Sequence, residues 1–240
     1  MKNRAIILTA ILFIFLFGIP STYAQKNRGI SIGLKVIGEN REGETQSSGR
    51  KFDSTDGGQF GFNLNFRKRR AYLGASFQGG KYKFENSGPD IVTTIEALPF
   101  SNGMIKYREM NLIAGYFFWE HVSLFVGVKS IEDEWENINF KQSFTGIGGG
   151  VSGIWPINAR WDFYGSAAFI PEGEVKTNKA KSGDGKSKAL EFGTVYRLSE
   201  RDRFTLGLKF STVVYAFDSG DEQEMKTNGL FIGYSHYFPF

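Results

Sequence analysis

A nine-residue segment reads Gln59-Phe60-Gly61-Phe62-Asn63-Leu64-Asn65-Phe66-Arg67, with a large apolar side chain at every second position and a small or polar one between. A period of two is typical of a β-strand with two unlike faces, whereas one face of a helix repeats every three to four residues. The segment therefore predicts a strand with one apolar and one polar face.

The same alternation recurs on both sides of this segment and predicts an all-β fold. Ten segments show it, the sixth of them with glycine at many of the intervening positions: 30–36, 60–66, 73–77, 110–118, 122–128, 147–155, 161–169, 190–198, 204–210 and 230–238. Ten is an even number, as an up-and-down barrel requires, and eight to twelve strands fit the pattern. No apolar run of 18 residues or more follows the first 24 residues, so no helix there could span a bilayer.

The connections between these segments alternate in length. Residues 67–70, 119–121, 156–160 and 199–202 form short turns, whereas 39–57, 85–103, 131–141, 171–187 and 216–227 are long and polar. A barrel that crosses a membrane has this asymmetry, because short turns lie on one side and long loops on the other. We therefore expect one antiparallel up-and-down transmembrane barrel with five long external loops.

Side-chain size indicates which face of each strand points inward. A soluble lipocalin-like barrel places its apolar face inside, and a membrane barrel places it outside. Here one face carries Phe, Leu, Ile and Val, while the opposite face carries many glycines, among them Gly61, Gly127 and Gly207. Small residues fit a concave interior, so the bulky face is expected to contact lipid. Ten residues at about 3.4 Å each and a tilt of roughly 40° span about 26 Å, close to the apolar band of an outer-membrane barrel.

The first 24 residues have the features of an export signal. Lys2 and Arg4 precede an apolar run over residues 5–17, and small residues follow, ending at Ala24. We predict cleavage after Ala24, which leaves residues 25–240 as the barrel domain. Loss of Lys2 and Arg4 reduces the 29 Lys and Arg to 27, which nearly balance the 25 Asp and Glu, so no nucleic-acid partner is indicated. The chain contains no cysteine and its stability must come from strand pairing and packing.

The chain ends in Gly233-Tyr234-Ser235-His236-Tyr237-Phe238-Pro239-Phe240. This ending, with the alternation before it, resembles the small bacterial outer-membrane β-barrel proteins, broadly the porin and OmpA-like group. The resemblance implies a place in the bacterial outer membrane, contact with its lipid, and reading of Tyr234, Phe238 and Phe240 by the barrel-assembly machinery. Pro239 departs from the pattern, because it lacks a backbone donor and is expected to shorten the pairing of the last strand.

Charged side chains on the polar face are the candidate functional residues of the lumen. They are Lys35, Arg67, Glu109, Lys129, Asp162, Glu191, Arg197 and Lys209. Charges of both signs in a narrow space pair with one another, which favours a filled interior over a conducting path. The cations outnumber the anions, so a residual path would weakly favour anions.

No catalytic, cofactor-binding or metal-binding group is predicted. Residues 148–153 fit G-x-G-x-x-G formally, but Pro156 follows closely and no helix can begin there to bind a pyrophosphate. The acidic stretches 183–185 and 218–222 lack the ligand spacing of an EF-hand. His121 and His236 are the only histidines, and Ser235 and His236 face opposite ways because they are adjacent in a strand.

Three functions fit this sequence. The first is a non-enzymatic outer-membrane barrel whose external loops have structural, adhesive or binding roles toward an external ligand or protein. The second is a narrow passive pore for small solutes. The third is a lipid-modifying or proteolytic barrel enzyme. A soluble ligand carrier is the structural alternative, since it shares the period of two.

Overall fold

The computed structural model describes residues 28–46, 50–85, 103–136 and 140–240. The predicted export signal, residues 1–24 with cleavage after Ala24, lies outside the described residues and stays a prediction. Among the described residues no helix is long and apolar enough to cross a membrane.

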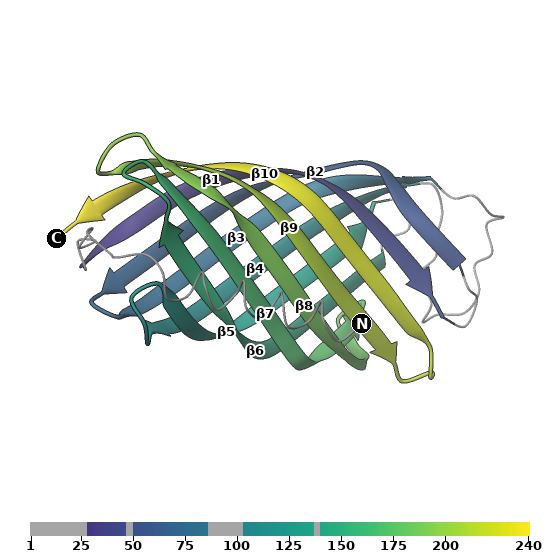
Figure 1. Cartoon of the computed structure of the whole chain (residues 1–240). Helices are drawn as coiled ribbons and strands as arrows, with labels where there is room; N and C mark the ends of the chain where they lie inside the picture. The colour runs from purple at the N-terminus through teal and green to yellow at the C-terminus, as the bar shows by residue number, and fades with distance from the viewer. Residues whose placement is uncertain (1–27, 47–49, 86–102, 137–139) are drawn as a thin grey trace, which may run out of the picture.

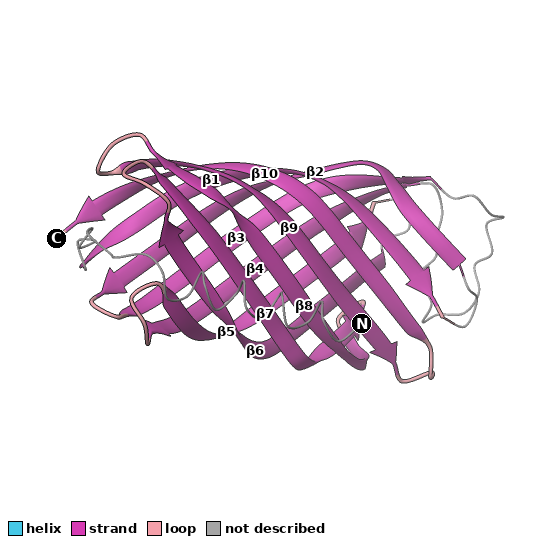
Figure 2. Cartoon of the chain, viewed as in Figure 1, coloured by secondary structure: helices cyan, strands magenta, loops and turns pink. Residues whose placement is uncertain are grey.

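Ten antiparallel strands close into one barrel, in which each strand pairs with its sequence neighbours and β1 pairs with β10 (Figures 1 and 2). The strands are β1 (Arg28–Thr45), β2 (Arg50–Lys68), β3 (Ala71–Glu85), β4 (Gly103–Phe117), β5 (Val122–Trp135), β6 (Phe140–Pro156), β7 (Trp161–Thr177), β8 (Ala180–Arg197), β9 (Asp202–Phe217) and β10 (Glu222–Pro239). The predicted all-β, ten-stranded up-and-down barrel is confirmed.

The bulky face of every strand points outward. On β1, Ile32, Leu34 and Val36 are exposed, and Val126 on β5 and Ile147 on β6 are 63% and 69% exposed. These side chains form a continuous apolar belt around the short-turn half of the barrel, far larger than the patches that water-soluble monomers expose. A soluble carrier with its apolar face inside does not fit this half of the molecule.

The strands continue far beyond the apolar belt. They are 14 to 19 residues long, which corresponds to about 37–50 Å of height at about 3.4 Å per residue and roughly 40° tilt, against an apolar band of about 25 Å. We call the additional part the extension; it comprises residues 37–45, 50–59, 78–84, 103–108, 130–135, 140–146, 170–187, 211–217 and 222–228.

The extension corrects the prediction of long external loops. Strands occupy most of 39–57, 131–141, 171–187 and 216–227, and the fifth predicted loop, 85–103, lies almost entirely outside the described residues. Between β7 and β8 the connection is only Asn178 and Lys179, both with positive φ, as in a tight two-residue hairpin. The prediction was wrong because outward residues become polar here, so the alternation no longer stands out as apolar against polar.

At the start of the extension the outward face of each strand becomes polar and the inward face becomes apolar. Outside, charged side chains pair across neighbouring strands, as Arg108 does with Glu132 at 3.0 Å and Lys141 with the same carboxylate at 3.1 Å. Inside, one apolar cluster fills the extension: Tyr82, Phe84, Ile105, Tyr107, Ile131, Trp135, Phe140, Phe144, Ile170, Val175, Val213, Tyr215, Phe217 and Met225. The extension is therefore built like a soluble barrel, with its large apolar side chains inside.

Candidate functional site

A layer of buried charges separates the apolar cluster from the rest of the lumen. The Glu109 carboxylate lies at its centre, where it accepts a hydrogen bond from Lys209 Nζ at 3.1 Å and lies 3.4 Å from Lys129 Nζ. Tyr107 and Asn111 donate to the same carboxylate at 2.6 and 2.8 Å. One carboxylate thus holds side chains of β4, β5 and β9 together, and burial without such partners would be costly.

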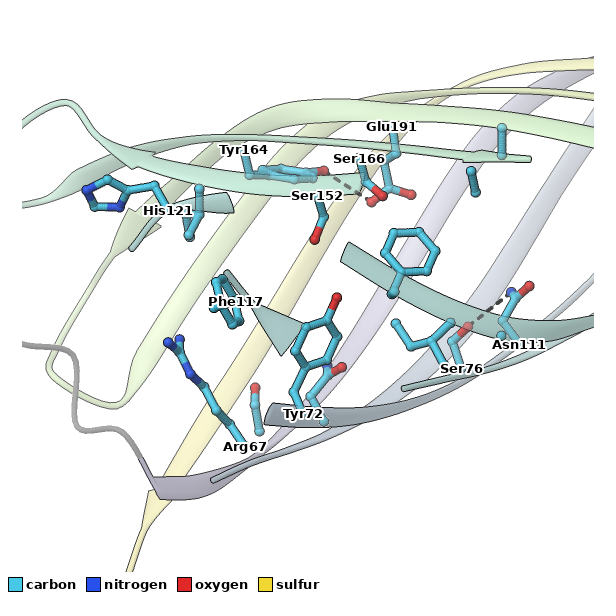
Figure 3. Close-up of a pocket in the computed structure, with 18 of the residues that line it drawn as sticks. Arg67, Tyr72, Ser76, Asn111, Phe117, His121, Ser152, Tyr164, Ser166 and Glu191 are labelled. Atoms are coloured by element: carbon cyan, nitrogen blue, oxygen red, sulfur yellow. Dashed lines mark hydrogen bonds between the residues drawn. The ribbon is translucent and has the colours of Figure 1, made fainter. Parts of the chain in front are cut away.

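A second pair joins β1 to β8 inside the lumen. Lys35 Nζ on β1 donates to the Glu191 carboxylate on β8 at 2.6 Å and lies 3.5 Å from the centre of the Phe231 ring. Tyr164 donates to the other Glu191 oxygen at 3.3 Å (Figure 3). The pair is therefore fixed on both sides by aromatic side chains.

At the short-turn end, Arg197 donates two hydrogen bonds to the Asp162 carboxylate, the Nε contact being 2.8 Å long. Asp162 is fully buried. Arg67 lies with its guanidinium 4.2 Å from the centre of the Phe117 ring and donates to the Arg69 carbonyl. A bidentate Arg–carboxylate pair is among the strongest side-chain contacts available.

The eight charged residues predicted for the lumen thus fall into four places. Glu109, Lys129 and Lys209 meet in one layer, Lys35 meets Glu191, Asp162 meets Arg197, and Arg67 lies apart from these groups against Phe117.

Sequence reasoning missed four further inward charges, namely Glu39, Arg41, Asp133 and Arg203. Glu39 and Arg41 continue the odd-numbered inward positions that begin at Lys35, so the parity of β1 could have identified them. They were missed because 39–57 was interpreted as a loop.

Arg41 and Asp133 form an ion pair inside the apolar cluster. The guanidinium donates to both carboxylate oxygens at 2.5 and 2.6 Å, and both residues are nearly inaccessible to solvent. The pair joins β1 to β5 across the barrel, and the Tyr107 ring lies 4.8 Å from the guanidinium carbon. Next to it, Gln59 and Tyr82 donate to the Glu39 carboxylate. These polar groups, with the apolar cluster, close the lumen.

A cavity of about 1260 Å³ lies on the short-turn side of the charge layer. Its walls reach from the turn residues Arg70, His121 and Glu200 to Glu109 and Lys209 in the charge layer. Arg67, Tyr72 and Phe117 project into it from β2, β3 and β4 (Figure 3). We call this cavity the chamber. Beyond it the charge layer and the apolar cluster block the way through the barrel.

The two histidines lie near the short-turn end but in different environments. His121 lines the chamber, whereas His236 is on the outer face, where Nδ1 lies 2.7 Å from the Asp202 carboxylate. Tyr234 and Ser199 donate to the same carboxylate at 2.5 and 2.6 Å. The Ser199 hydroxyl contacts the acid rather than the imidazole, so these groups do not form a Ser-His-Asp relay.

The carboxyl-terminal strand keeps its pairing to the end. Pro239 lies opposite Gly29 of β1, so the expected shortening of the last strand is not observed. Tyr234 and Phe238 are exposed on the outer face, and the Phe240 ring stacks on Phe66 with centroids 5.8 Å apart. The terminal aromatic residues thus belong to the apolar belt.

No group of three or more His, Cys, Asp or Glu side chains in the described ranges could hold a metal ion.

Comparison with known proteins identifies the fold. The structure is similar to the outer membrane protease OmpT from Escherichia coli, with a TM-score of 0.55 and 10% sequence identity over 91% of this chain and 99% of that one. The fold is that of a bacterial outer-membrane β-barrel.

Two further structures align with lower scores. Ail, the attachment invasion locus protein of Yersinia pestis, gives a TM-score of 0.39 at 13% identity over 88% of this chain and 99% of that one. A mutant of the monoaromatic hydrocarbon channel TodX gives 0.38 at 8% identity over 88% and 90%. No protein-family model and no curated protein sequence matches the chain.

Proposed function

We propose that the chain is a non-enzymatic, non-conducting barrel of the bacterial outer membrane whose extension stands in water at the cell surface and has a structural, adhesive or binding role. Its partners are the lipid around the apolar belt, the assembly machinery at the last strand, and an external ligand or protein at the extension. The outer-membrane fold and the apolar belt support this location.

The observation that carries the proposal is that the outward face of a single strand changes from apolar to polar along its length. On β1 the outward residues are Ile32, Leu34 and Val36 and then Asn40 and Glu42. An apolar exterior is stable only against lipid, and a charged exterior over an apolar core is stable only in water. One strand therefore crosses from lipid into water, and the extension is a rigid, water-exposed platform rather than a set of free loops.

Cysteine labelling tests which side the extension occupies, since the chain has no cysteine of its own. Ser219→Cys places a thiol in the turn after β9, and Ala159→Cys places one in a short turn. A membrane-impermeant maleimide should label the first variant in intact cells and the second only after the outer membrane is permeabilised. The reverse pattern would overturn the proposed orientation.

The passive-pore alternative is disfavoured by the occluded lumen. The extension is filled by the apolar cluster with Arg41 and Asp133, and the charge layer around Glu109 lies on its short-turn side. We expect no steady single-channel steps when the folded protein is inserted into a planar bilayer, with a wide porin as the reference. Reproducible steps from correctly inserted protein would show an open path and favour the pore.

The enzyme alternative has no imidazole or thiol at the extension. The sequence has two histidines, and both lie toward the short turns. A cysteine nucleophile is also absent, because the chain has none. Proteolytic or lipid-modifying chemistry based on an imidazole at the extension is therefore unsupported.

A further inference from the structure

The short-turn end of the chamber carries more positive than negative side chains. Of the residues that the structure describes, five arginines line it against three carboxylates: Arg67, Arg69, Arg70, Arg197 and Arg203 against Glu120, Asp162 and Glu200. The deeper carboxylates, Glu109 and Glu191, are each held by lysines. The excess positive charge is thus concentrated near the turns, where a solute from the adjoining compartment would enter.

Two of these arginines are directly opposite each other in the sheet. Arg197 on β8 and Arg203 on β9 are paired residues, both facing the chamber. Like charges opposite each other on neighbouring strands destabilise a sheet. Asp162 is hydrogen-bonded to Arg197, whereas it attracts the Arg203 guanidinium only through space. The Arg203 guanidinium therefore adds a positive charge that does not contribute to strand pairing.

Arg203 also has an unsatisfied donor. Its Nε atom is buried and makes no hydrogen bond to the described part of the chain. A buried donor without an acceptor is costly, and a planar guanidinium fork matches the oxygens of a phosphate or carboxylate. An oxyanion beside Arg203 would satisfy this donor and reduce the repulsion from Arg197.

Aromatic side chains lie in the same chamber. The Tyr72 and Phe117 rings contact each other with centroids 5.4 Å apart. On β10, the Tyr237 ring lies over Gly29 of β1. This ring is therefore placed between Arg203 on β9 and Arg67 on β2. Figure 3 shows Tyr72 and Phe117 beside Arg67. This wall offers a planar apolar group a surface to stack on.

We propose that the chamber binds a small, water-soluble organic phosphate with a ring, its phosphate held by Arg203 and its neighbour Arg197 and its ring placed against Tyr72 and Phe117. The site faces the compartment of the short turns, and the apolar cluster lies between it and the far end of the extension. It is therefore independent of the proposed role of the extension.

Calorimetric titration of the folded full-length protein in detergent micelles tests the site with three probes: phenyl phosphate, inorganic phosphate and benzyl alcohol. We expect saturable binding of phenyl phosphate, weaker binding of inorganic phosphate and no saturable binding of benzyl alcohol. Added salt should weaken the binding of both phosphates. Equal binding of benzyl alcohol and phenyl phosphate, or no saturable binding of either phosphate at millimolar concentration, would overturn the proposal.

Variants locate the binding. Arg203→Gln is expected to raise the Kd of phenyl phosphate about ten-fold or more, because it removes a charged donor to the anion. Arg203→Lys, which keeps the charge but not the fork, should have an intermediate effect. Arg201→Gln is the matched control, since Arg201 is exposed in the preceding turn and does not line the chamber. Folding is checked by the heat-dependent mobility of the barrel on gels. An unchanged Kd in a folded Arg203 variant would contradict the assignment.

Discussion

Arg41→Met is expected to lower the free energy of unfolding by about 3–5 kcal/mol, because it leaves the Asp133 carboxylate buried without its ion-pair partner. Both side chains lie within the apolar cluster, where Asp133 is only 2% exposed. The measurement is urea unfolding of the barrel in lipid vesicles, followed by tryptophan fluorescence. The double variant Arg41→Met with Asp133→Leu should lose much less stability, since an apolar pair of similar volume replaces both charges.

A surface ion pair provides the matched control. Arg108 and Glu132 pair at 3.0 Å on the outside of the extension, where water screens their charges. Arg108→Met is expected to cost at most about 1 kcal/mol. If Arg41→Met were no more costly than Arg108→Met, or if the double variant lost the sum of both single losses, the buried pair would not hold the closed end together.

Leu34→Arg is expected to destabilise the inserted barrel by about 2–4 kcal/mol, because it places a charge on the lipid face near the middle of the apolar belt. Asn40→Arg changes an outward residue of the same strand six positions further on, in the extension. Exposed positions in water tolerate such changes within about 0.5 kcal/mol. Both positions are exposed on the same face of β1 and both pair with β10, Leu34 opposite Tyr234 and Asn40 opposite Asn228.

The comparison is made by urea unfolding of each variant in vesicles, with assembly into the outer membrane of cells as a second measurement. Leu34→Arg should also reduce the amount of assembled barrel, whereas Asn40→Arg should not. Similar losses for the two variants would show that the apolar belt is not in contact with lipid, and the proposed position of the extension would then fail as well.

Sequence reasoning predicted the parts of the fold that depend on neighbouring residues. The alternation from Gln59 to Arg67 predicts both the strand and its outward face, since side chains of a strand alternate by geometry. The same parity correctly separates Ser235 from His236. It fails at Glu39 and Arg41, because their outward neighbours are polar and the contrast between the faces disappears while the strand continues.

Contacts across the barrel could not be read from the same pattern. Lys35 and Glu191 are 156 positions apart, and Arg41 and Asp133 are 92 apart. Which inward residues meet depends on how many strands close the barrel and how far each is shifted along its neighbour. The charge layer, the closed extension and the arginine-lined chamber all follow from that closure.

The sequence by itself determined that strands form, which face of each meets lipid, and that charges point into the lumen, because a strand imposes a period of two on its own residues. Only the tertiary structure decided that the far half of the lumen is filled and that the strands rise beyond the belt. The physical reason is that the partner of an inward side chain across the lumen depends on the registers of all the strands between them. These registers are a property of the closed sheet rather than of any one segment.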